Sequence, residues 1–213
     1  VPETAQIGGD LTIEGWVNIS NYVDNARFFD FANGVGNGGI NYLLFSPYAS
    51  SGDTRGYFNV QGANGTDYQV RFPAPALNTW THLAAVVESS GTMRVYINGV
   101  EAVNRTGVNL PASVARTRSF LGRSNWPNDA LFRGSMRDVR IWDVARTAAQ
   151  IQAGMALGSI SGTTSGLVAA YATGLTGEPY LKDTSGNGRD LIQQGQTTFV
   201  ENAILFPGSN THT

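Results

Sequence analysis

The chain has 213 residues, of which 26 are glycine and none is cysteine, and its formal net charge is −2. This length suffices for one all-β sandwich, and a charged fraction of only 14% suits short strands and tight turns better than disorder. The composition excludes the basic surface of a nucleic-acid binder, disulfide or thiolate chemistry, and insertion into a membrane, since no apolar run approaches the roughly 20 residues of a span.

Alternating apolar residues predict short strands from the first part of the chain onward. The expected strands span 10–19, 27–32, 40–46, 57–60 and 68–72. The glycine-rich segment 33–39 lacks the Lys-Ser/Thr ending of a phosphate loop, so we interpret it as a tight connection between strands.

The segment 80–104 predicts a meander of three antiparallel strands. Its first arm ends at small polar residues and Gly91, and its second arm, 93–97, alternates between apolar and polar residues. Asn98-Gly99 then indicates a type I′ hairpin turn, which needs positive φ at both central residues. A meander must cover its apolar face, so a second layer is expected.

After the meander, the pattern predicts an irregular crossing, a strand at 118–123, a loop at 124–131 and a strand at 134–143. One short helix is expected at 147–155, with Thr147 as its N-cap. A Ser/Thr/Gly-rich stretch follows and is typical of a connection.

Three motifs in this order carry a family resemblance. They are TIEGWV at 12–17, the Trp-Thr-His and Tyr-Ile-Asn-Gly ends of the meander, and GSMRDVRIWDVARTAAQI at 134–151. Together they resemble the laminin-G-like and pentraxin-like branch of the concanavalin A-like lectin and glucanase superfamily. The resemblance implies an all-β jelly-roll sandwich of two curved antiparallel sheets, and we expect one such domain over 1–213.

The tail, 166–213, resembles the opening segment of a laminin-G-like repeat, but it stands at the opposite end of the unit. Its matching pieces are GLVAAY, DTSGNGRDL and AILFPGS. Either the unit is circularly permuted and residues 203–206 fill a vacant strand position in this chain, or the tail begins a next unit. Closure within the chain is expected, because an open position would expose an unpaired strand edge.

No catalytic residues are expected, so the sequence predicts a protein that is not an enzyme. Glycanases on this fold resemble one another in a Glu-x-Asp-x-Glu strand, which is absent here. Glu14 has no second acid at the right spacing. His82 belongs to the Trp-x-His motif and is expected to be a hydrogen-bonded structural histidine.

Calcium is the expected cofactor, in a structural role. The loop 183–190 offers oxygen ligands from Asp183, Asn187 and Asp190, although the same string could form an Asx-turn without a metal. The loop 124–129 resembles in position the calcium loop of pentraxins. Its one acid is Asp129, so a paired-calcium site is not expected there.

Two loops fit the recognition of a glycan, which needs an aromatic ring for stacking and polar groups for the hydroxyls. Trp126 in the first loop could provide the ring, or could instead cover the edge of the sandwich. The candidate ligand-binding residues are Trp126, Arg123, Asn125, Asn128 and Asp129 in that loop and Tyr48, Asp53 and Arg55 in the second. Trp16, Trp80 and Trp142 fall in strands and are expected in the core.

The resemblance implies a non-catalytic extracellular module that binds a glycan or polysaccharide, as part of a larger secreted or surface protein. Another protein surface is the alternative partner. Two other functions stay open: a calcium-stabilised structural or adhesion repeat without a small ligand, and a glycan hydrolase or lyase.

Overall fold

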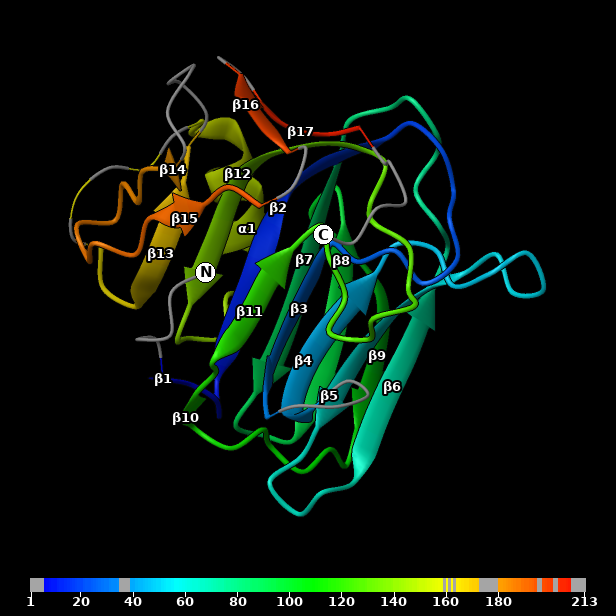
Figure 1. The fold of residues 1–213 in the computed structure, drawn as a ribbon. Coiled ribbons are helices and arrows are strands. Elements are labelled where there is room, and N and C mark those ends of the chain that lie inside the picture. Colours follow the sequence, from blue (N-terminus) through cyan, green and yellow to red (C-terminus); the bar gives the residue numbers. More distant parts are fainter. Residues whose placement is uncertain are drawn as a thin grey trace.

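The computed structural model describes residues 6–34, 39–158, 160, 162, 164–172, 180–194, 197–200 and 203–207. Two antiparallel sheets are stacked face to face (Figure 1). The five-stranded sheet has the order β11 (Arg118–Leu121), β3 (Phe29–Asn33), β4 (Ile40–Ser46), β5 (Gly56–Gln61) and β6 (Asp67–Phe72). This stacking confirms the predicted jelly-roll sandwich.

The eight-stranded sheet contains β16 (Thr198–Val200), β17 (Ala203–Phe206), β12 (Gly134–Trp142), β2 (Leu11–Ile19), β7 (Thr81–Glu88), β8 (Thr92–Ile97) and β9 (Val100–Thr106) in that order, and β13 (Leu167–Tyr171) pairs with β12. Two small strand pairs lie beside the sheets, β1 (Gln6–Ile7) with β10 (Val114–Ala115) and β14 (Tyr180–Leu181) with β15 (Leu191–Ile192).

The core lies between the sheets and is rich in phenylalanine. Phe29, Phe31, Phe45 and Phe58 alternate inward from β3, β4 and β5, and each is at most 1% exposed. Each fully buried ring contributes on the order of 2 kcal/mol from the hydrophobic effect. Strict alternation from Phe29 would place Phe28 on the opposite face. It is nevertheless buried in the core, because it precedes β3 and does not follow the alternation of that strand.

The predicted meander forms β7, β8 and β9. Gly91 has φ 75° at the first turn, and Asn98 and Gly99 have φ 50° and 75° at the second. Positive φ at both residues is what a type I′ turn requires. The hairpin signal in the sequence is therefore confirmed.

Helix α1 (Ala148–Ala156) packs on the outer face of the eight-stranded sheet. Thr147 is its N-cap, and a capping box joins Thr147 and Gln150 through mutual side-chain to backbone hydrogen bonds. Ile151 packs against Ala84, Val86 and Tyr96. The described part of the chain contains no helix long and apolar enough to cross a membrane.

The C-terminal strands complete the eight-stranded sheet. β17 pairs with residues 134–136 of β12, and β13 pairs with residues 139–142 of the same strand, so the two lie end to end along it. The ring of Phe206 packs edge-on against Phe132, at 5.5 Å between centroids, and occupies the space where a Cβ on Gly122 would lie. The predicted closure by residues 203–206 is confirmed, whereas the single domain over 1–213 stays a prediction.

Candidate functional site

The outer face of the five-stranded sheet carries aromatic and polar side chains. A small apolar cluster of Ala32, Tyr42, Leu44, Ala49 and Tyr57 lies on it, separate from the core, and Trp126 packs against this cluster. Polar residues continue the face on β5 and β6, at Asn59, Gln61, Gln69 and Arg71. We call the surface formed by Tyr42, Tyr57, Arg71, Trp126 and Asp53 the aromatic face.

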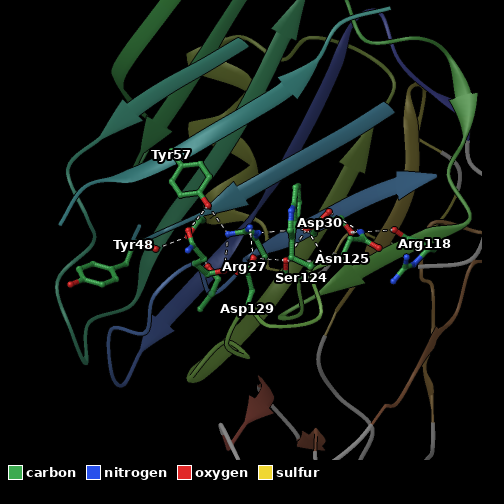
Figure 2. A network of polar contacts seen from close by, with 12 residues as sticks. Arg27, Asp30, Tyr48, Tyr57, Arg118, Ser124, Asn125 and Asp129 are labelled. Carbon is green, nitrogen blue, oxygen red and sulfur yellow. Dashed lines mark hydrogen bonds and ion pairs between the residues drawn. The ribbon is translucent and has the colours of Figure 1, made fainter. Parts of the chain in front are cut away.

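Arg27 is buried beneath the aromatic face and connects its parts (Figure 2). Its guanidinium donates to the hydroxyl of Tyr57 and to a carboxylate oxygen of Asp129, both at 2.7 Å. It also lies over two rings, 5.6 Å from the centroid of Tyr57 and 5.5 Å from that of Trp126. Because these contacts fix the guanidinium, the rings around it are held before any ligand arrives.

The loop that bears Trp126 is pinned to β3 by the buried carboxylate of Asp30. Asn125 donates to Asp30 from its backbone N–H at 3.0 Å and from its side-chain amide at 2.8 Å. Burial raises the pKa of Asp30, although the hydrogen bonds from Asn125 and the charge of Arg27 oppose the shift. The Ser124 hydroxyl donates to Asp129 at 2.8 Å and accepts from the backbone N–H of Trp126 at 3.0 Å.

The indole of Trp126 is partly exposed, and its position on the aromatic face is fixed by its neighbours. Its ring meets that of Tyr42 edge-on, at 5.8 Å between centroids and 68° between planes. Burial, followed by the neighbouring carboxylate of Asp67, raises the pKa of Tyr42, so its hydroxyl stays protonated.

Asp53 joins the second predicted loop to the same surface. Its carboxylate pairs with Arg55 at 2.9 Å and with Arg71 at 2.7 Å, and the Arg71 guanidinium lies 5.5 Å from the centroid of the Tyr57 ring. The side-chain hydrogen bond from Arg55 is the main cause that lowers the pKa of Asp53 to about 2. The two loops that the sequence treats separately therefore meet on one face.

The remaining predicted ligand-binding residues take different positions. Asn128 is exposed beside Trp126. Asn125 is 1% exposed and supports the loop from below. Arg123 turns away, over the ring of Phe120 and toward Gln194, where it donates at 3.2 Å. Tyr48 is 9% exposed and stacks on Tyr22 at 4.5 Å between centroids.

Sequence reasoning missed Arg27, Asp30, Tyr42, Tyr57 and Arg71. All lie on, or next to, strands of the five-stranded sheet. A signal was present, because polar residues recur at every second position of β5 and β6, as expected for a sheet face that borders water.

The predicted calcium loop does not fit a cation. Asp183 accepts hydrogen bonds from the backbone N–H groups of Ala170, Ser185 and Arg189 at 2.9–3.0 Å, and from the Ser185 hydroxyl at 2.9 Å. Burial raises its pKa, but these hydrogen bonds outweigh that effect and leave the pKa lowered. Carboxylate oxygens surrounded by donors are not available as calcium ligands.

The other two predicted metal ligands of this loop also form hydrogen bonds within the fold, although those of the Asn187 side chain involve only its NH2 group. Asn187 directs its amide NH2 group to the carbonyl oxygens of Leu167 and Val168, and Asp190 accepts from the backbone N–H of Asp183 at 2.8 Å. Among the residues that the structure describes, no three acidic or histidine side chains gather as a metal site. The loop is hydrogen-bonded as an Asx-turn, the other reading of its sequence.

Trp142 is buried as expected, but Trp16 and Trp80 are partly exposed on the outer face of the eight-stranded sheet. Their predicted place in the core is wrong. A large apolar residue in a strand can point to either face of the sheet. Helix α1 covers only part of the outer face of the eight-stranded sheet, so residues there can remain partly exposed.

A family model described as the concanavalin A-like lectin/glucanases superfamily matches residues 1–152, so the chain belongs to this superfamily. A comparison with curated protein sequences finds no match. Solved structures of three bacterial proteins are similar to the chain, and they come from Bacteroides ovatus, Geobacillus stearothermophilus and Ruminococcus gnavus.

The first is a candidate carbohydrate-binding protein from Bacteroides ovatus, with TM-score 0.60 and 20% identity. The similarity covers 86% of this chain and 51% of the Bacteroides protein, so this chain spans about half the length of that protein. The second is domain 4 of an extracellular arabinanase from Geobacillus stearothermophilus, in complex with arabinotriose, with TM-score 0.58, 25% identity and coverage of 72% and 70%. The third is the CBM40 of a Ruminococcus gnavus sialidase, bound to sialyllactose, with TM-score 0.57, 10% identity and coverage of 70% and 83%.

Proposed function

We propose that the chain is a non-catalytic carbohydrate-binding module of a secreted or surface protein, and that a neutral glycan binds across the aromatic face. The observation that carries the proposal is the partly exposed indole of Trp126, held in place by Tyr42 and Arg27. An indole fixed in this way can stack on the C–H face of a sugar ring with little loss of entropy.

Polar groups around Trp126 suit the hydroxyls of the sugar. Asn128 offers an amide, and the Asp53–Arg71 pair offers both an acceptor and donors at the other end of the face. Opposite charges pair within the face, so it favours a neutral ligand over a strongly charged one.

The similar structures support a carbohydrate as the ligand, and the arabinanase domain is the one seen with a neutral sugar. The arabinanase domain is seen with arabinotriose and the sialidase module with sialyllactose. The arabinanase is an extracellular enzyme, which supports a place outside the cell for this chain as well.

The carboxylates near Trp126 support a role in binding without catalysis. Asp30 and Asp129 both contact the Ser124 hydroxyl, at 3.4 and 2.8 Å. A glycosidase needs two carboxyl groups that reach the scissile bond from the surface. Asp30 is fully buried and holds Asn125, while Asp129 pairs with Arg27, so neither is free to act on a substrate.

The test is affinity electrophoresis on neutral polysaccharides such as arabinan, xylan and β-glucan, followed by calorimetric titration with oligosaccharides of any polymer that retards the protein. Trp126→Ala is expected to weaken binding at least about tenfold, which corresponds to about 1.4 kcal/mol. Tyr180→Ala removes an exposed ring from β14, outside the aromatic face, and should bind like the wild type. Unchanged binding by Trp126→Ala, or release of reducing sugar by the wild type, would contradict the proposal.

A further inference from the structure

A second group of aromatic and charged residues lies on the opposite side of the sandwich. Trp16 of β2, Trp80 just before β7 and Arg137 of β12 lie on the outer face of the eight-stranded sheet, and all three are partly exposed. The carbon at the centre of the Arg137 guanidinium is 4.6 Å from the centroid of the Trp80 ring and 5.4 Å from that of Trp16. We call these three residues the Trp–Arg cluster.

The charge of Arg137 is not neutralised by any partner that the structure describes. No ion pair or hydrogen bond joins its guanidinium to another described residue, and its Nε is buried without a partner. Contacts with ring faces leave the N–H groups at the edge of the guanidinium unused. The buried Nε is out of reach of a ligand, but the terminal N–H groups of this partly exposed side chain are not buried, so an acceptor from a ligand would be favoured there.

The backbone of β12 is irregular next to this arginine. The pairing of β12 with β2 shifts register between Arg137 and Arg140, and Asp138 within the shift has φ 51°. Bulges of this kind redirect a side chain and are frequent next to functional sites. Here the irregularity accompanies a guanidinium that lies against two indoles.

Further polar groups extend the Trp–Arg cluster. Asn18 and Ser135 are register partners two residues along β2 and β12 from Trp16 and Arg137, so they share the same face. Both are partly exposed, and neither side chain forms a hydrogen bond within the described residues. They are therefore available to the hydroxyls of a bound sugar.

We propose that the Trp–Arg cluster is a second binding site, which takes a carboxylate-bearing sugar such as a uronic acid residue of an acidic polysaccharide. A sugar ring stacks on an exposed indole, and its carboxylate accepts hydrogen bonds from the guanidinium of Arg137, whose planar fork matches a carboxylate. The two sites lie on different sheets, so this inference does not depend on the aromatic face.

The experiment measures calorimetric affinity of the intact chain for oligogalacturonate and for the same oligosaccharide with its carboxyl groups reduced to alcohols. The wild type is expected to bind the acidic form at least tenfold more tightly, with an affinity that falls as salt is raised. Arg137→Gln and Trp80→Ala should each lose at least tenfold in affinity for the acidic form, whereas Trp126→Ala should keep wild-type affinity.

A matched control separates a specific site from general attraction between charges. Arg105→Gln removes one positive charge from β9, where Arg105 lies over Tyr68, and should leave the affinity unchanged. If Arg137→Gln fails to fold by circular dichroism, Arg137→Lys replaces it and should lose several-fold, because it keeps the charge without the fork. Equal affinity for the acidic and reduced forms, wild-type binding by a folded Arg137 variant, or an equal loss in Arg105→Gln would overturn the proposal.

Discussion

His82 of β7 is 1% exposed, and its Nε2 lies 3.8 Å from a carboxylate oxygen of Glu14. Burial, reinforced by the positive charges of Arg140 and Arg146, lowers the pKa of His82 to about 3. The predicted structural role agrees with this burial. Contrary to expectation, Nδ1 has no hydrogen-bond partner among the described residues.

The lowered pKa of His82 makes stability depend on pH. Below its ordinary pKa of 6.5 the unfolded histidine takes up a proton that the folded one refuses until about 3, so the free energy of unfolding falls as the pH falls through this interval. The slope from this residue approaches about 1.4 kcal/mol per pH unit. Burial raises the pKa of Glu14. Above its ordinary pKa of 4.5, this shift therefore makes the free energy of unfolding fall as the pH rises, opposite to the effect of His82.

Urea unfolding of the wild type and of His82→Gln at about pH 7 and about pH 5, which lie on either side of the ordinary histidine pKa of 6.5, isolates this contribution. The wild type should lose more stability than the variant over the interval, because Glu14 is common to both. Parallel curves would mean that His82 takes up its proton over the same pH range in the folded and the unfolded chain, so that its pKa is not lowered.

Asn125 illustrates what sequence can and cannot predict about a single side chain. Its loop and its polar neighbours are visible in the sequence, and the loop does lie at the aromatic face. Its burial against Asp30 follows from the pairing of β11 with β3, which brings together residues 95 positions apart. Spacing along the chain contains no information about such a contact.

At the scale of elements, the structure confirms those whose sequence carries a period or a turn signal. The meander, the strands of the five-stranded sheet and α1 are of this kind. Sequence reasoning also gave no strand at β13, whose five residues are all buried and so show no alternation. The other strands that it missed, β1, β10, β14, β15 and β16, have two or three residues each. Alternation needs at least four residues to be recognised, so tertiary pairing alone determines these short strands.

Strand β17 offers a direct test of the closure of the eight-stranded sheet. Phe206 faces the core, whereas Leu205 on the same strand is 37% exposed. Phe206→Ala should cost about 3–5 kcal/mol of unfolding free energy. Leu205→Ala is the matched control and should change stability by no more than about 0.5 kcal/mol. Both are measured by urea unfolding, and equal small effects would indicate that β17 does not pack in solution.

For the whole molecule, the hydrogen-bonded loop 183–190 implies stability without calcium. Asp183 already accepts donors at both carboxylate oxygens. Thermal melts in excess calcium and in excess EDTA should therefore have the same midpoint. A cation that binds only the folded chain would stabilise it by about 2.7 kcal/mol at a hundred times its dissociation constant, so a higher midpoint in calcium would contradict the prediction.

The architecture was predictable as a whole because three motifs in the right order identify the superfamily and its fold. The aromatic face and the Trp–Arg cluster were less predictable from the sequence. Loop residues such as Trp126 and Asp53 stood out, but Arg27 and Tyr57, which connect them, lie on or beside strands and resemble ordinary sheet residues in the sequence. Sequence reasoning did not predict the Trp–Arg cluster for a related reason, because tryptophans in strands are typical of a core.

The position of β17 beside β12 also has a consequence for synthesis. Residues 134–136 acquire their second neighbour only from residues 204–206. While the intervening chain leaves the ribosome, this edge of β12 stays open and Met136 lacks its cover. We therefore expect the nascent chain to expose this edge to chaperones until its last described strand emerges, and to complete the sheet slowly, because the pairing joins distant segments.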